Sequence, residues 1–107
     1  MIRKERFLQK IRHAFTNGKY LVRFHAHVKM REREILVSEA LRVIQDGEIV
    51  EFYPDARPYP SCLILGIVDS KPIHVVCALS PEGIGFLVTA YIPSIEEWES
   101  DYRRRKK

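Results

Sequence analysis

The sequence has little of what holds metal ions or disulfides. Its 107 residues include two cysteines, Cys62 and Cys77, and both lie within apolar stretches. Their spacing differs from the C-x-x-C pairs of structural zinc sites, so a metal would have to recruit histidines from elsewhere in the chain. We therefore expect two buried free thiols rather than a disulfide, no metal site and no cofactor.

Long hydrophobic runs are also absent. The longest apolar runs fall far short of the roughly 18 to 20 residues that a membrane-spanning helix needs. The N-terminus is charged and no apolar core of a secretory signal follows it. The chain also lacks a glycine-rich phosphate loop, a nucleophile elbow and a two-histidine zinc helix. These absences favour a soluble, cytoplasmic protein with no membrane partner.

The composition is that of an ordinary globular protein with an excess of positive charge. Hydrophobic residues make up 46% of the chain, charged residues 30%, and the formal net charge is +4. A chain of this length forms one domain, which we place at residues 1–107. Residues 103–107 form an uninterrupted basic tail. Such a tail attracts polyanions, or simply keeps the end of the chain solvated.

Hydrophobic periodicity predicts helices first and strands afterwards. Expected helices cover residues 2–16, 24–34 and 38–46, with a short extended segment at 20–22, and expected strands cover 48–53, 62–68, 73–79 and 85–92. The first helix would begin at Ile2, and Ser38 would cap the third. The turn at residues 69–72 predicts that the strands on either side of it pair as an antiparallel hairpin.

The last predicted element is a C-terminal helix. Ser94 and Glu97 have the spacing of a capping box, and Ile95, Trp98 and Tyr102 follow at helical intervals. The predicted fold class is therefore α+β, with N-terminal helices packed on a four-stranded, mainly antiparallel sheet and a helix at the C-terminus. The strand at 48–53 would lie at an edge of the sheet, where it could pair with a second copy to give a homodimer.

One stretch, residues 24–33, concentrates groups that a core does not require. If it is helical, His25, Lys29, Glu32 and Arg33 lie at i, i+4, i+7 and i+8, and so share one face. This pattern is typical of a solvated basic helix surface. It is equally typical of a site for a phosphate-bearing ligand, with a histidine that can transfer a proton near neutral pH.

His74 is the second unusual residue, because it is polar and lies in the middle of an apolar strand. On that strand His74, Val76 and Ala78 share one face. The register of the next hairpin decides whether His74 lies near Thr89 or near Tyr91. An unpaired buried polar group costs roughly 1 to 3 kcal/mol, so the imidazole either is hydrogen-bonded within the sheet or serves as a general acid or base.

These residues together suit cleavage of RNA without a metal ion. The reaction needs a base for the 2′-hydroxyl, an acid for the leaving oxygen and cations for the charged phosphorane. His25 and His74 would be the proton-transfer pair, and Glu32 would orient His25 or form an ordinary helical ion pair. The other predicted site residues are Arg33 and Tyr91 in the catalytic group, with Lys29, Arg31 and Thr89 binding substrate phosphate. The alternative is a non-catalytic domain that binds nucleic acid or a protein, with the same residues joining helix to sheet.

Three pieces of the sequence resemble one family. Residues 25–33 are similar to the His-Ala-x-x-Arg-Met-x-Glu-Arg motif of the domain-of-unknown-function family 4258. Residues 63–66 and 72–76 fit its Leu-x-x-Gly and Pro-Leu-His-Val-Val patterns, and residues 88–93, followed by Trp98, fit its Thr-x-Tyr-x-Pro ending. The resemblance covers roughly residues 20–105. Lys29 stands where the family usually has arginine, which weakens a bidentate phosphate contact there.

The resemblance implies a small α+β domain whose order of elements is similar to that of bacterial toxin ribonucleases of the RelE and BrnT kinds. Such toxins act on RNA and are held in check by a cognate antitoxin protein. The family residues that this chain shares are His25, Lys29, Glu32, Arg33, His74, Thr89 and Tyr91. The resemblance therefore implies a toxin of a toxin–antitoxin pair, with RNA and an antitoxin as its partners.

Overall fold

A computed structural model describes residues 3–107, and Ile2, where we expected the first helix to begin, lies outside the described residues. The described elements are α1 (Lys4–Thr16), β1 (Tyr20–Val22), α2 (Phe24–Glu32), α3 (Val37–Asp46), β2 (Glu48–Tyr53), β3 (Ser61–Val68), β4 (Lys71–Leu79) and β5 (Gly85–Tyr91). The α+β class is confirmed, and the third helix begins one residue before Ser38, its predicted cap.

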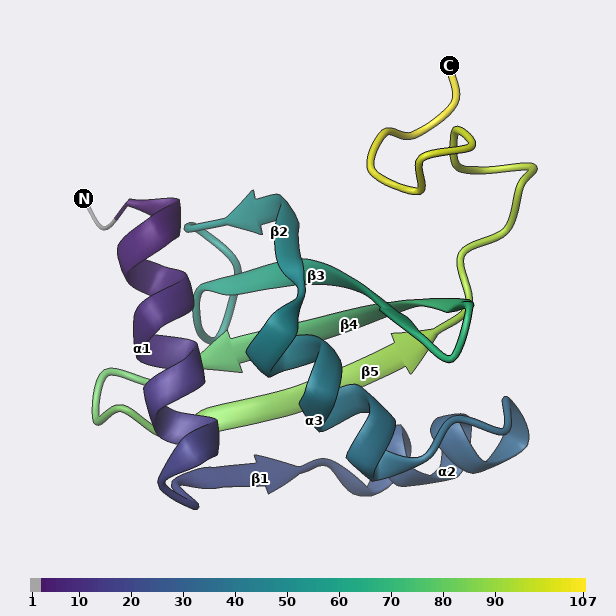
Figure 1. Cartoon of the computed structure of the whole chain (residues 1–107). Coiled ribbons are helices and arrows are strands. Elements are labelled where there is room, and N and C mark those ends of the chain that lie inside the picture. Colours follow the sequence, from purple (N-terminus) through teal and green to yellow (C-terminus); the bar gives the residue numbers. More distant parts are fainter. Residues whose placement is uncertain (1–2) are drawn as a thin grey trace.

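All five strands form one sheet in the order β1-β5-β4-β3-β2 (Figure 1). The pairs β2–β3, β3–β4 and β4–β5 are antiparallel, whereas β1 runs parallel to β5. Helices α1 and α3 pack on one face of the sheet, and α2, which follows β1 directly, packs beside β5. The predicted hairpin at 69–72 is present, since Val68 pairs with Lys71, and Asp69 and Ser70 both have positive φ.

The predicted four-stranded, mainly antiparallel sheet is wrong, because residues 20–22 form a fifth strand and make the sheet mixed. A strand of three residues carries no measurable periodicity, and its partner lies far along the chain. The amide of Gly85 donates a 2.9 Å hydrogen bond to the carbonyl of Lys19. A Cβ on Gly85 would lie 2.6 Å from the Phe15 ring, so glycine lets the end of α1 and β1 approach β5.

The predicted C-terminal helix is also wrong. The capping interaction forms, since the amide of Glu97 donates to Ser94 Oγ at 3.3 Å, but only one turn follows. The chain then reverses, and the amide of Glu99 donates to the carbonyl of Arg104 at 2.8 Å. Trp98 packs against His74 at the sheet surface directly after this turn, so tertiary packing rather than local capping determines the path of the segment.

The sheet has a helix-covered face and a second face, which we call the outer face and which includes His74, Val76 and Ala78 of β4. The prediction that these three residues share a face is confirmed, because Ile73, Val75, Cys77 and Leu79 belong to the core beneath the helices. That core contains Phe7, Ile11, Ala14, Phe15, Ala26, Met30, Ile35, Ala40, Val43, Ile44, Cys62, Ile64, Val68, Ile73, Val75, Cys77, Leu79, Leu87 and Ala90. Both cysteines are buried and free, as predicted.

A regular alternation along residues 85–92 would put Leu87 on the same face as Thr89 and Tyr91, but β5 departs from this alternation at one point. Val76 pairs with Thr89, but the next residue of β4, Cys77, pairs with Leu87, so the register shifts by one residue. This bulge turns Leu87 into the core and places Phe86 opposite Ala78 on the outer face. A bulge leaves no trace in the alternation itself, which is why a regular period gave the wrong face for Phe86.

Candidate functional site

Helix α2 presents its two histidines to solvent. Ala26 and Met30 face the core, whereas His25 and His27 are exposed. Among the described residues neither imidazole has a side-chain hydrogen bond. Both rings are therefore accessible to a ligand, and the structure treats His27, which we did not select, in the same way as His25.

The other selected groups of α2 form part of a charged surface. Lys29 Nζ lies 3.5 Å from Glu32 Oε1, an ion pair at i and i+3 in which both side chains are more than one third exposed. Arg31 is exposed on the same helix. Glu32 thus contacts Lys29 rather than His25, which corresponds to the ordinary helical ion pair that we considered for it.

Arg33 connects α2 to the sheet. It is the C-cap residue directly after α2, and its Nη1 donates to the carbonyl of Ala90 at 2.9 Å and to Thr89 Oγ1 at 3.3 Å. The side chain of Arg33 remains exposed, so its other N–H groups face solvent. Two predicted site residues that are 56 positions apart, Arg33 and Thr89, are therefore in contact.

His74 is completely buried and bonded through both ring nitrogens. It pairs with Tyr91 across the β4–β5 ladder, and its Nδ1 lies 3.3 Å from the Tyr91 hydroxyl. Its Nε2 lies 2.8 Å from the carbonyl of Tyr102. A carbonyl only accepts, so Nε2 carries the proton and Nδ1 accepts from the Tyr91 hydroxyl. The histidine is a neutral imidazole linked to two tyrosines.

Burial dominates the electrostatics of this pair. It lowers the pKa of His74 below its ordinary value of 6.5, although the Tyr102 carbonyl and the charge of Glu51 act in the opposite direction. Burial also raises the pKa of the Tyr91 phenol. Both groups are therefore held in their uncharged forms at neutral pH.

The C-terminal segment covers His74. The indole of Trp98 meets the imidazole edge to face, with ring centroids 4.4 Å apart. The guanidinium of Arg105 lies over the Trp98 ring, 4.6 Å from the ring centre, and its Nε is 2.8 Å from Glu51 Oε2. The chain returns toward the sheet, where Arg103 forms an ion pair with Glu48 of β2.

Glu51 is the anchor of this segment on β2. Burial raises the pKa of its carboxyl group, but hydrogen bonds from Arg105 and Tyr53 more than offset this effect, so the pKa lies below its ordinary value. The carboxylate accepts from Arg105 in a bidentate manner, with the second contact at 3.1 Å.

The structure brings together four of the eight residues selected from the sequence. Arg33 contacts Thr89, and Tyr91, two residues along the same face of β5, contacts His74. Within residues 3–107, no hydrogen bond joins His25 to this group, and Lys29, Arg31 and Glu32 remain on the α2 surface. The open hairpin register is thus resolved in favour of Tyr91 as the partner of His74.

Sequence reasoning missed an aromatic and cationic cluster farther along the outer face. The rings of Tyr59 and Phe86 stack with their centroids 5.5 Å apart, and the guanidinium of Arg23 lies 5.6 Å from the Phe86 ring centre. A regular alternation would put Phe86 on the helix-covered face, and Tyr59 lies in a proline-rich loop whose path has no periodic signal. Of the three residues, only Arg23 lay next to an element that the sequence predicted, since it immediately precedes α2.

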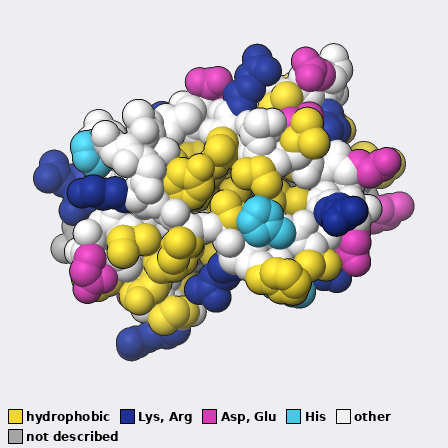
Figure 2. Space-filling model, turned by 90° about the horizontal axis from the view of Figure 1, so that it is seen from below, with side chains coloured by type: hydrophobic (Ala, Val, Ile, Leu, Met, Phe, Trp, Pro, Cys, Tyr) yellow, Lys and Arg dark blue, Asp and Glu magenta, His cyan; other side chains and the backbone are white. Residues whose placement is uncertain are grey.

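The surface nearest to β1 and α2 mixes hydrophobic and basic side chains (Figure 2). Leu21, Phe24 and Leu36 are 58%, 82% and 64% exposed. These exposures are high for large apolar residues, which gives the cationic α2 surface an apolar border.

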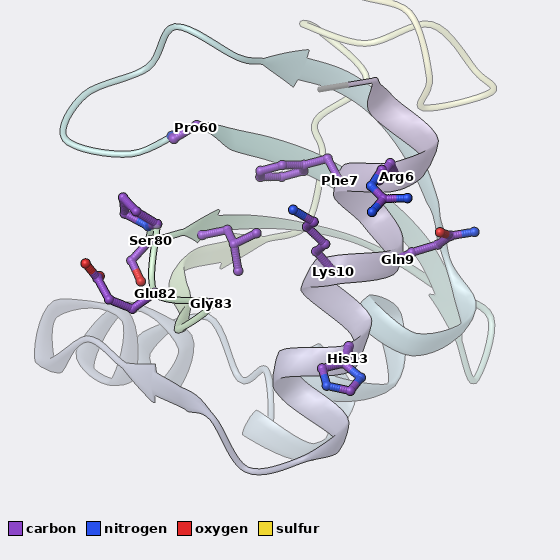
Figure 3. Close-up of a pocket in the computed structure, with 11 residues that line it drawn as sticks. Arg6, Phe7, Gln9, Lys10, His13, Pro60, Ser80, Glu82 and Gly83 are labelled. Atoms are coloured by element: carbon purple, nitrogen blue, oxygen red, sulfur yellow. The ribbon is translucent and has the colours of Figure 1, made fainter. Parts of the chain in front are cut away.

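A separate cavity of about 640 Å³ lies between α1 and the turn that joins β4 to β5. Figure 3 shows Arg6, Lys10 and His13 projecting from α1 on one side, with Glu82 of the turn opposite them. The cavity lies at the far ends of β4 and β5 from His74 and Tyr91, so it does not belong to the His74 site. The basic residues of α1 and the turn at residues 80–83 are each visible in the sequence, but only the fold shows that they face each other across a cavity.

Within residues 3–107, no cluster of three or more histidine, cysteine or acidic side chains has the arrangement of a metal site. None of the helices described has the length and apolar character needed to cross a membrane.

Comparison with protein families gives a match over the central part of the chain. A family model described as "Domain of unknown function (DUF4258)" matches residues 22–92. The chain belongs to the DUF4258 family. No curated protein and no solved structure matches it. The match contains α2, Arg33, His74, Thr89 and Tyr91, and it ends before the segment that carries Trp98.

The DUF4258 resemblance inferred from the motifs is therefore confirmed, over a shorter range than the residues 20–105 that we expected. The likeness to RelE and BrnT toxins has no support in these comparisons and stays a prediction. DUF4258 membership itself specifies no activity, so function has to be argued from the groups that the fold brings together.

Proposed function

We propose that this DUF4258 domain is an RNA-binding, toxin-type endoribonuclease that works without a metal ion, with its site at the end of β5 beside α2. The observation that supports this best is the row of polar groups formed by Arg33, Thr89, Tyr91 and His74. The row combines a cation, two hydroxyl groups and an imidazole within the part of the chain that matches the family.

The surroundings of the row suit a single-stranded, negatively charged polymer. Arg33 has N–H groups free for a phosphate, and Lys29 and Arg31 continue the positive charge along α2. The stacked rings of Tyr59 and Phe86, with Arg23 beside them, offer bases a place to stack. Binding would thus combine phosphate contacts at α2 with stacking on the outer face.

In the proposed cleavage step, a base removes the proton of the 2′-hydroxyl, the oxygen attacks phosphorus, and an acid protonates the departing 5′ oxygen. His25 and His74 are the proposed pair. Acid and base act on different oxygens of one phosphate, so the two imidazoles need not touch. His74 cannot meet substrate while the C-terminal segment covers it, and cleavage therefore requires that segment to move.

One observation favours the second candidate, a non-catalytic domain that binds nucleic acid or a protein. The imidazole of His74 is 0% exposed, and no buried side-chain polar atom among the described residues lacks a hydrogen-bond partner. A fully satisfied polar network is what a structural role requires. In that case His74 and Tyr91 join the sheet to the C-terminal segment and never contact a substrate.

The two exposed histidines of α2 provide the test. Purified wild type, His25→Ala and His27→Ala are incubated with labelled RNA in the presence of EDTA. Because both positions are exposed, both variants should melt within a few degrees of wild type. The nuclease proposal predicts at least a hundredfold loss of cleavage for His25→Ala and near-normal cleavage for His27→Ala.

Other outcomes reject the nuclease proposal. If wild type leaves RNA intact but binds it, and Arg33→Gln weakens that binding, the binding-domain candidate replaces it. Growth arrest on induction in a bacterial host, compared between wild type and His25→Ala at equal soluble expression, applies the same test in cells. A cognate antitoxin and a homodimer remain predictions, which co-purification and the mass in solution would test.

A further inference from the structure

The segment at residues 94–107, which we call the C-terminal cover, lies on the outer face without regular helix or strand. Its apolar contact is Trp98, which is 2% exposed and packs on His74. Its polar contact in the same place is the Tyr102 carbonyl, which accepts from His74 Nε2. The cover is thus the structural reason that His74 has no access to solvent.

The cover is held to β2 by ion pairs near the surface. Arg103 pairs with Glu48, and both side chains are about half exposed. Arg105 pairs with Glu51, where the arginine is 55% and the glutamate 21% exposed. The exposed Arg103–Glu48 pair is individually weak, whereas the bidentate Arg105–Glu51 pair is stronger but keeps its arginine more than half exposed, so a polyanion can compete for both cations. Arg103 and Arg105 can therefore exchange their carboxylate partners for the anionic groups of a ligand.

The end of the cover is rich in charge of one sign. Residues 103–107 are all arginine or lysine. Arg104 pairs with Asp101 inside the cover rather than with the sheet. A polymer of phosphates would meet a high density of positive charge here, and binding would release its counterions.

We propose that the C-terminal cover is a displaceable lid whose arginines exchange Glu48 and Glu51 for the phosphates of a polyanion and so uncover His74 and Tyr91. The inference rests on the proposed function in one respect, namely that the natural polyanion is RNA. The family match ends at residue 92, so the lid lies outside the matched core. Binding of substrate and exposure of the imidazole are then one event.

The chain contains a built-in probe for this movement, because Trp98 is its single tryptophan. The emission wavelength of Trp98 and its quenching by acrylamide are followed while the protein is titrated with inorganic polyphosphate, which does not absorb where tryptophan does. Polyuridylate provides the second arm. The lid predicts a red shift and increased quenching with both polymers, and little change with sodium chloride of equal ionic strength.

A matched pair of variants separates lid opening from general charge effects. Glu51→Gln and Glu82→Gln each remove one negative charge, but only Glu51 holds the cover. Glu51→Gln should reach its half-maximal Trp98 change at about fivefold lower polyphosphate concentration than wild type. Glu82→Gln, on the exposed β4–β5 turn, should titrate like wild type.

Unchanged Trp98 emission at saturating polyphosphate, or identical titrations for the two variants, overturns the lid. The nuclease proposal is tested separately, by measuring RNA cleavage in the samples that contain polyuridylate. If Trp98 becomes exposed and RNA remains intact, the lid stands and the nuclease proposal fails. If RNA is cut while Trp98 emission stays fixed, the lid fails, and the protein is a nuclease that does not use the buried His74.

Discussion

Replacing His74 by alanine should strongly destabilise the protein. The imidazole lies between Trp98 and Tyr91, and truncation leaves a cavity the size of a ring. Losing a buried ring costs about 3 kcal/mol, and the unpaired Tyr102 carbonyl adds about 1 kcal/mol. A domain of this size has a total stability of only about 5 to 15 kcal/mol. We therefore expect His74→Ala to lower the melting temperature by roughly 10 to 20 °C.

Urea denaturation followed by circular dichroism measures the effect, with His74→Phe as the matched variant. Phenylalanine retains the ring against Trp98 and loses only the hydrogen bonds, so its cost should be near 1 kcal/mol. If His74→Ala unfolds within 0.5 kcal/mol of wild type, the packing described around His74 is wrong. The prediction also means that lost activity in His74→Ala would not by itself prove catalysis, whereas the exposed His25 permits a clean test.

Three further predictions concern the core and the titration of buried groups. Gly66→Ala should destabilise by about 1 to 3 kcal/mol in urea, because its Cβ would lie 2.8 Å from Val43 Cγ2 and 3.1 Å from Val43 Cα; a neutral result would contradict the close packing of α3 on β3. Stability should be flat above about pH 7 and fall toward pH 5.5, since burial holds the pKa of His74 below 6.5 and the unfolded chain binds that proton first; His74→Phe should lack this part of the loss, and an identical pH profile would refute it. Cys62 and Cys77 should react with a thiol reagent only after unfolding, because burial raises the pKa of Cys62 to about 12 and that of Cys77 well above its ordinary value; rapid labelling of native protein would argue against their burial.

Helices and strands long enough to show several repeats of the hydrophobic pattern were predictable from the sequence. Elements that form only because a distant segment pairs with them were not. The segment at residues 73–79 alternates regularly, so its faces and its hairpin were correct. Residues 20–22 are a strand only because β5 returns beside them. A glycine inside a strand is typical of a bulge, but Gly66 pairs regularly with Ile73, and its lack of a side chain instead admits Val43. Only the packed structure could reveal which neighbour required the glycine.

The candidate site was likewise predictable in part: the sequence showed which residues belong to it, but not whether they are accessible. The chemistry of Arg33, Thr89, Tyr91 and His74 was visible in residue type and motif spacing, and the fold places these residues next to one another in pairs. Their accessibility was not visible, because it depends on the C-terminal segment. A capping box and apolar residues at i, i+3 and i+7 predicted a helix there. Neither of these local signals reports that Arg105 pairs with Glu51 on a strand 54 residues away.

The position of Tyr102 shows why cover and imidazole depend on each other. Its φ is +59°, in the left-handed region that costs a non-glycine residue about 1 kcal/mol or more, and this conformation accompanies the carbonyl bond to His74 Nε2. While that bond exists, His74 cannot offer Nε2 to a substrate, and Nδ1 is already bonded to Tyr91. Once the cover leaves, the backbone of Tyr102 relaxes, and the imidazole regains water and the higher pKa that hydration gives it. The contacts that make His74 inert in this arrangement are thus the ones whose loss would make it suitable for proton transfer.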